Sequence, residues 1–439
     1  MVNFHPSLCP DRAWELVRRW FCVSVILINS AITVVADVNL PVIFENASVS
    51  GEFRTLFFQR DFKDGSVDQE DFAAGGKLRF ETGDIQGVSA GFSIYTAQGM
   101  GMNDADKNVY NLLARGKNGK HESYTALGEA YLLGNFGDTS IQIGRQEMRT
   151  PWIDFYDIRM TPQSFEAIVL KNKTIPDLQI VAAHVTRMKK RTDTTFQSMS
   201  EAAGAVEEKP VSAGGLIFTG IPTISLEAWD YYADDMWNDI YVRGACTIHM
   251  GEKVSLFANV RYLDRQEVGD RIAGPIGTHM YGMQGGLKAL GAELSFAYSE
   301  NGQGPILRPW GHDLAVSIQV HVADRAEETA WCSCLKYDFS PIGLKNVSGS
   351  VTYGVFSTPD NGSNASPDRN EIDFNVQYDC GHWIKGMNLQ IRYAIIHEDE
   401  TLGGEDFNDF RFYLRCPFSW YPLKKPISSK ESPTNPPQS

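Results

Sequence analysis

The chain has 439 residues, with 40 Lys and Arg against 54 Asp and Glu, a formal net charge of −14 and 11% aromatic residues. An acidic chain lacks the basic surface that the phosphate backbone requires, which excludes nucleic acid as a partner. The length would suit about two or three soluble domains, but Gly is frequent (39 residues) and no long amphipathic helix with caps is visible.

The N-terminus has the pattern of a secretory signal peptide. Arg18 and Arg19 precede the apolar run 20–29, and the small-residue pattern Val34-Val35-Ala36 follows. These are the basic region, apolar region and cleavage site of an export signal. The alternative is an uncleaved anchor, but the run is shorter than the ~20 residues that a spanning helix needs. Loss of the signal peptide 1–36 leaves 37 basic and 52 acidic residues.

Beyond Ala36, apolar and polar residues alternate with a period of two, which is typical of half-buried strands. From Phe410 to Phe418 the even-numbered residues are apolar, and Arg411 and Arg415 lie between them. With no second apolar stretch long enough for a helix, a membrane crossing must use strands closed into a barrel. A soluble β-sandwich is the alternative, because its strands alternate as well.

Three features favour the membrane barrel. The alternation runs through nearly the whole chain, charged residues recur at the polar positions, and aromatic residues gather at strand ends, as in interfacial girdles. The girdle candidates are Phe57, Phe58, Tyr298, Tyr353, Tyr378 and Tyr393.

Eighteen strands are expected, an even number as in bacterial single-chain barrels. They lie near residues 47–60, 73–83, 86–97, 122–134, 138–146, 164–171, 176–187, 212–220, 222–232, 238–249, 252–263, 280–290, 291–299, 328–339, 345–356, 370–380, 386–397 and 407–418. The fold class is therefore all-β: a transmembrane antiparallel β-barrel of about 18 strands over residues 37–418, after a cleaved signal peptide. Arg145 has the parity of the apolar Ile141 and Ile143, so a bulge is expected there.

The connections alternate between short and long. Turns such as 82–87, 134–138 and 220–223 are short and are assigned to the periplasmic side, whereas 98–121, 147–163, 188–211, 264–279, 300–327 and 357–369 are long and are assigned to the outside or the lumen. Residues 419–439 are rich in Pro and Ser, which predicts a disordered C-terminal tail.

Two loop segments resemble the OprD-like family of 18-stranded outer-membrane porins. Residues 144–167 contain Thr150-Pro151, Asp157-Ile158-Arg159 and Pro162-Gln163-Ser164-Phe165, similar in order to the family's third extracellular loop. Residues 306–313 contain Pro309-Trp310-Gly311-His312-Asp313, similar to its seventh loop. The resemblance implies that both loops fold into the lumen and narrow it, and that a column of inward basic residues guides carboxylates.

That resemblance, together with strand parity, defines candidate site residues. The constriction loops are expected to contribute Arg149, Asp154, Asp157 and Arg159, with Asp313 opposite. The inward basic ladder is expected to comprise Arg54, Lys77, Arg79, Arg243, Arg261, Lys288, Arg392, Arg411 and Arg415. Fixed charges beside a narrow, low-dielectric pore select permeants by charge and fit. The alternative role for each is a structural ion pair with an inward acid such as Glu52, Glu81, Glu129 or Asp373.

Catalytic and metal signatures are absent from the sequence. There is no His-Glu-x-x-His, Gly-x-Ser-x-Gly or Walker motif. Cys380 with His382, and His321 with Cys332 and Cys334, fit no zinc spacing. The five cysteines after residue 36 are an odd number without framework spacing. No enzyme activity, cofactor, metal or disulfide framework is therefore expected.

The sequence as a whole predicts a Gram-negative outer-membrane porin for passive, substrate-selective diffusion of amino acids or carboxylates into the periplasm. A general, weakly selective porin and a structural or adhesive surface barrel are the alternatives. Expected partners are outer-membrane lipid, small-molecule permeants and the barrel-assembly machinery, and a homotrimer is left open. The family usually ends at a terminal aromatic residue, here Phe418, but 21 residues follow it.

Overall fold

The computed structural model describes residues 46–63, 65–104, 106–117 and 119–420. The expected signal peptide 1–36 and residues 421–439 of the expected tail lie outside the described residues. No described helix is long and apolar enough to cross a membrane.

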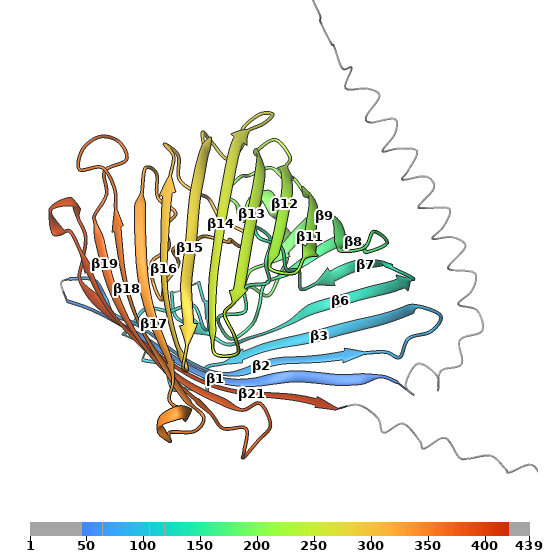
Figure 1. Cartoon of the computed structure of the whole chain (residues 1–439), viewed down its shortest axis with the longest axis horizontal. Coiled ribbons are helices and arrows are strands. Elements are labelled where there is room, and N and C mark those ends of the chain that lie inside the picture. Colours follow the sequence, from blue (N-terminus) through green and yellow to red (C-terminus); the bar gives the residue numbers. More distant parts are fainter. Residues whose placement is uncertain (1–45, 64, 105, 118, 421–439) are drawn as a thin grey trace, which may run out of the picture.

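Eighteen long strands form a single closed antiparallel sheet (Figure 1), which confirms the predicted barrel and its strand number. β1 pairs with β21 from Val49↔Trp420 to Phe62↔Phe407, so the first and last strands close the barrel and leave no free edge. The strands are β1 (Ser48–Phe62), β2 (Gln69–Glu81), β3 (Val88–Gln98), β6 (Tyr124–Phe136), β7 (Thr139–Gln146), β8 (Ser164–Asn172), β9 (Leu178–Lys189), β11 (Val211–Ile221), β12 (Ile224–Ala233), β13 (Trp237–His249), β14 (Val254–Glu267), β15 (Thr278–Ala289), β16 (Ala292–Asn301), β17 (Thr329–Asp338), β18 (Val347–Ser357), β19 (Arg369–Asp379), β20 (Asn388–Glu398) and β21 (Phe407–Trp420).

The remaining elements are short and lie in the connections. They are β4 (Ala114–Arg115), β5 (His121–Glu122), β10 (Gln197–Ser198), α3 (Met199–Ala202), η2 (Ser340–Ile342) and η3 (Glu400–Leu402). Ser198 caps α3 in a capping box with Glu201.

The period of two places apolar side chains outside and polar ones inside. Leu78, Phe92 and Val260 are among the exposed apolar residues on the outer face, where lipid would cover them. Phe58 is an exception among the girdle candidates, because it points inward. It is fully buried, and its ring lies 5.1 Å from that of Tyr413.

Arg145 does not lie at a bulge. It pairs in register with Ala130 on β6 and with Glu166 on β8, and it keeps its outward parity. Its Nε lies 2.8 Å from Glu166, and its guanidinium lies 4.3 Å from the centre of the Phe196 ring. Glu166 thus gives Arg145 a cross-strand partner of opposite charge, and the nearest change of register lies one strand further on, between Glu166 and Ala167 in the β8–β9 pairing.

The register does shift in β6. Ser93 of β3 pairs with Glu129 and Ile94 pairs with Leu127, which leaves Gly128 as the extra residue. A Cβ at Gly128 would lie 2.1 Å from the Tyr95 ring. Only glycine therefore fits this bulge without displacing Tyr95.

Loop 3 (147–163) and loop 7 (302–328) pack inside the barrel, and loop 4 (190–210) joins them through Met199. Trp152, Met199 and Trp310, one from each loop, belong to the largest buried cluster together with inward residues of β8 to β15. Trp310 stacks on Trp237 of β13 at 5.0 Å, and its Nε1 donates to the carbonyl of Met199 at 2.9 Å. Apolar burial therefore fixes these loops against the wall and positions their polar residues.

Candidate functional site

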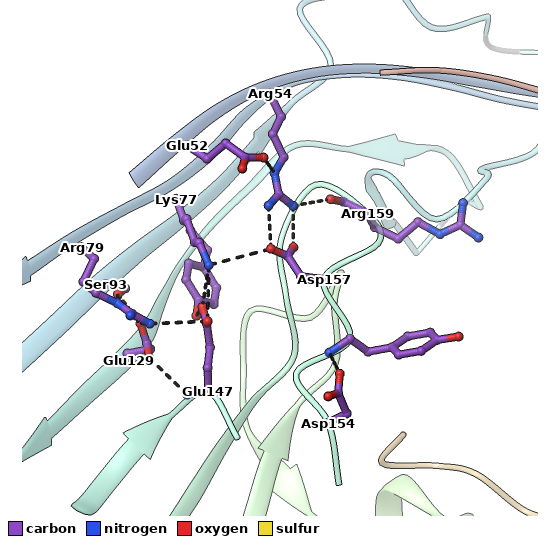
Figure 2. Close-up of polar contacts among 12 residues, drawn as sticks. Glu52, Arg54, Lys77, Arg79, Ser93, Glu129, Glu147, Asp154, Asp157 and Arg159 are labelled. Carbon is purple, nitrogen blue, oxygen red and sulfur yellow. Dashed lines mark hydrogen bonds and ion pairs between the residues drawn. The ribbon is translucent and has the colours of Figure 1, made fainter. Parts of the chain in front are cut away.

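Loop 3 contacts the wall at β1 through Asp157 (Figure 2). Arg54 is 3% exposed, and its Nη2 donates to Asp157 Oδ2 at 2.6 Å while its Nη1 donates to the carbonyl of Arg159 at 2.7 Å. Glu52 contacts the same guanidinium. Burial opposes ionisation of Asp157, but Arg54 and Lys77 hold the pKa of its carboxyl below the usual range.

Lys77 and Arg79 of β2 extend this cluster along the wall. Lys77 Nζ lies 3.1 Å from Glu147 and 3.8 Å from Asp157. Arg79 Nε donates to Glu129 Oε2 at 2.8 Å. The cluster is a network of alternating charges that joins β1, β2, β6 and the start of loop 3 (Figure 2).

Loop 7 contacts the facing wall through Asp313. Its carboxylate accepts hydrogen bonds from Arg243 at 2.9 Å, from Arg261 at 2.7 Å and from the Tyr241 hydroxyl at 2.6 Å. β13 is the tenth strand around the 18-stranded ring and β1 is the first, so the two contact points face each other across the barrel.

Between these walls the two loops touch each other. The backbone N–H of Asp154 donates to the carbonyl of Trp310 at 3.0 Å. Gly311 has φ 142°, and a Cβ there would lie 2.8 Å from the Asp154 nitrogen. The glycine therefore permits the approach of loop 7 to loop 3, and the joined loops extend across the inside of the barrel.

Arg159 lies on the side of loop 3 away from Asp157 and carries an unsatisfied guanidinium. Its Nε and Nη1 are buried without a hydrogen-bond partner, and it lies 4.8 Å from the centre of the Phe58 ring. Burial, followed by the neighbouring Arg411 and Arg191, lowers the pKa of Arg159.

Three further arginines line β20 and β21. Arg411 Nε donates to Asp409 at 2.7 Å. Arg415 lies opposite Arg54 in the β1–β21 register, and it contacts the Tyr413 ring at 4.9 Å. The side chains of Arg415 and Arg392 form no hydrogen bond or ion pair with any residue in the described ranges.

Two sequence candidates lie apart from this arrangement. Arg149 is 72% exposed and pairs with Asp154 of its own loop at 3.2 Å. Lys288 pairs with Glu293 at 2.9 Å beside the short β15–β16 turn, at the end of the barrel away from loops 3 and 7.

Sequence reasoning missed Glu147, Tyr241 and Asp409. Tyr241 shares the inward parity of Arg243, a usable signal, and Asp409 likewise alternates with Arg411. Glu147 lies just after β7, where parity no longer applies, and only the tertiary structure brings it to Lys77.

A closed 18-stranded barrel with an apolar outer face, and with loops folded inward onto charged walls, is the architecture of an outer-membrane porin. The family described as outer membrane porin, OprD family, matches residues 43–420. The chain belongs to this family. It is an outer-membrane channel protein, and family membership makes it a channel rather than an enzyme.

Known relatives are similar over most of their length. Porin D of Pseudomonas aeruginosa is 22% identical over an alignment of 414 residues. The match covers 85% of this chain and 91% of that protein. The structure of P. aeruginosa OccK9 (OpdG) has a TM-score of 0.80 at 21% identity and covers 86% of this chain and 99% of that one. P. aeruginosa OpdK with vanillate has a TM-score of 0.75 at 19% identity and covers 86% and 100%, respectively.

Proposed function

We propose that the protein is a substrate-selective channel for small carboxylates, with amino acids among the candidate permeants. The main support is that the side chains of Arg392 and Arg415 face inward and have no carboxylate partner within hydrogen-bond distance. The neighbouring cations Arg54 and Arg411, in contrast, are paired with carboxylates. A cation without a fixed partner can exchange one permeant anion for the next, because no protein carboxylate competes for it.

The contacts of Arg54, the cross-strand neighbour of Arg415, also support a free cation at Arg415. Arg54 and Arg415 are opposite each other in register, and adjacent like charges repel. Asp157 and Glu52 form ion pairs with Arg54, whereas no carboxylate lies within ion-pair distance of the Arg415 side chain. A passing carboxylate would supply the counter-charge that the Arg415 side chain lacks. The vanillate in the similar OpdK structure is itself a carboxylate.

The test is conductance and ion selectivity in planar bilayers. The wild-type protein should give discrete current steps with a preference for anions, and benzoate should reduce the chloride current. Arg415→Gln and Arg392→Gln should each lower the anion preference. Arg187→Gln is a matched control, because Arg187 is 43% exposed and pairs with Glu208 outside the ladder. Steps that no carboxylate or amino acid blocks would instead indicate a general porin, and the absence of steps would indicate a structural barrel.

We also propose that the barrel-assembly machinery recognises the aromatic end of β21, which contains Phe418 and extends to Trp420. Both side chains are exposed. Replacing Phe418 with Ser should reduce the amount of folded barrel in the outer membrane while refolding in detergent continues. Unchanged membrane levels would contradict this role.

A further inference from the structure

A polar cavity of about 270 Å³ lies among four loops on the long-loop side of the barrel. Loops 3, 4 and 7 line it together with Asn111 of the β3–β6 connection. Its basic lining residues are Lys190, Arg191 and Arg308. The volume is slightly below the ~300–1,000 Å³ of drug-sized ligand pockets, which suits a smaller solute. The cavity is separate from Arg415 and Arg392, which do not line it.

Arg191 is held in place by its backbone, while its side chain remains unpaired. Its carbonyl accepts hydrogen bonds from Thr161 Oγ1 at 2.6 Å and from the Tyr124 hydroxyl at 2.9 Å. Its guanidinium lies 5.3 Å from the centre of the Tyr156 ring, and it forms no hydrogen bond or ion pair with the part of the chain that the structure describes. The ring orients the guanidinium without neutralising it.

His312 supplies a second unsatisfied group at the cavity. Its Nε2 lies 2.8 Å from the Tyr156 hydroxyl, whereas its buried Nδ1 has no partner. Burial, followed by the nearby Arg308, lowers the pKa of His312 to about 3, so the imidazole is neutral at physiological pH. A neutral imidazole carries its proton on one nitrogen, so in the tautomer whose Nε2 accepts from the Tyr156 hydroxyl the proton lies on Nδ1, which has no partner.

Tyr156 itself is held in a conformation that few residues adopt. It has φ 45°, and its backbone N–H donates to Asp154 Oδ1 at 2.6 Å. Non-glycine residues in this region are uncommon and persist only where the surroundings determine them. The strained backbone positions one ring that contacts both Arg191 and His312.

The charges around the cavity favour an anion. Arg308 shares its charge with Asp324 at 2.6 Å, and Asp193 is the one carboxylate among the lining residues. Asp193 forms no ion pair with Arg191, Arg308 or Lys190 within 4 Å. Burial, and after it the proximity of Arg308, lowers the pKa of Arg191, so a bound anion would stabilise the charged guanidinium.

We propose that this loop cavity is a binding site for a small carboxylate, with Arg191 as its principal cation and Arg308 and His312 Nδ1 as further donors. It is an outer site in addition to the ladder. The guanidinium groups of Arg159 and Arg411 lie 4.8 and 5.2 Å from the centre of the same Phe58 ring. Thr161, two residues after Arg159, donates to the Arg191 carbonyl, so Arg159 lies between the cavity and the ladder. Its role in uptake rests on the proposed function, but its binding can be measured without conduction.

The experiment is calorimetric titration of the detergent-solubilised barrel with sodium benzoate, with benzyl alcohol as the neutral analogue. Benzoate should bind saturably, and benzyl alcohol should not. Arg191→Gln should weaken benzoate binding by about tenfold or more, the usual effect of removing a charged hydrogen bond. Arg308→Gln should weaken it less, because Arg308 already contacts Asp324. Arg187→Gln is the matched control and should bind as the wild type does.

Full benzoate binding in Arg191→Gln would overturn the proposal, as would the absence of saturable binding to the wild type. Circular dichroism confirms that each variant is folded. An anion-selective channel without cavity binding would refute only the outer site, whereas cavity binding in a non-selective barrel would refute only the proposed function.

Discussion

Arg243 and Arg261 face each other in register on β13 and β14, and the single carboxylate of Asp313 from loop 7 binds both of them. Like charges opposite each other on a sheet destabilise it. The loop therefore supplies the charge that the wall lacks, and the wall in turn fixes the position of the loop. Arg54 and Asp157 form the corresponding contact on the facing wall.

Asp313→Asn should release loop 7 from this wall and leave two adjacent arginines without their shared counter-charge. Removing one partner of a buried ion pair costs ~3–5 kcal/mol of stability. Because Asp313 is partly exposed, we expect the loss for Asp313→Asn to be about 3 kcal/mol or less. We expect faster proteolysis within loop 7 and a shift of the reversal potential toward anions in a KCl gradient. Glu208→Gln, which removes the same charge at an exposed site, should change neither.

Arg159→Ala should reduce the preference for anions, because the variant removes a cation whose guanidinium has buried, unpartnered nitrogens beside Phe58. The main-chain carbonyl of residue 159 still accepts from Arg54, so loop 3 should remain docked. The measurement is the reversal potential in a bilayer, with Arg187→Ala as the control. Unchanged selectivity would remove loop 3 from the constriction.

His321 should make the docking of loop 7 dependent on pH. Its Nδ1 lies 2.8 Å from Glu371 and its Nε2 lies 3.0 Å from Glu398, which also pairs with Arg369. The rings of Phe356 and Phe407 enclose it. Burial alone would lower the pKa of His321, but the contacts with Glu371 and Glu398 outweigh burial and raise it.

The raised pKa belongs to the docked loop, so proton binding favours docking. The stabilisation of docked loop 7 by protonated His321 is complete below the ordinary His pKa of about 6.5. It is lost as the pH rises through the raised pKa of His321. Proteolysis of loop 7 should therefore be slower at pH 6 than at pH 9, and His321→Gln should abolish that difference. An equal difference in the variant would assign it to another group.

Gly128→Ala should impair folding of the barrel, because the added Cβ would lie 2.1 Å from the Tyr95 ring at the β6 bulge. Overpacking of this kind costs ~1–3 kcal/mol or more. The folded fraction in a urea titration should decrease. Gly214→Ala is the control, since a Cβ at that position meets no atom within 4 Å. Equal stability of the two variants would show that Tyr95 moves freely.

The strands were predictable because their signal is local. A strand between lipid and lumen alternates from one residue to the next, so parity alone placed Arg411 and Arg415 inside and Phe410 outside. Parity also gave the correct face for Arg145, but the bulge expected there was wrong, because Arg145 stays in register and pairs with Glu166 on the next strand. Girdle reasoning misplaced Phe58 because it ignored parity.

The partners of the inward charges were decided by tertiary structure alone. The sequence placed Asp157 and Asp313 in inward loops only through a family resemblance, and no local pattern connects Asp157 with Arg54, 103 residues away. Which arginines are paired, and which remain free as Arg191 and Arg415 do, depends on how loops 3 and 7 pack inside the closed ring and on how loop 4 joins them. The alternation that determines the barrel repeats along the chain, whereas the ion pairs form between segments that only closure of the barrel brings together.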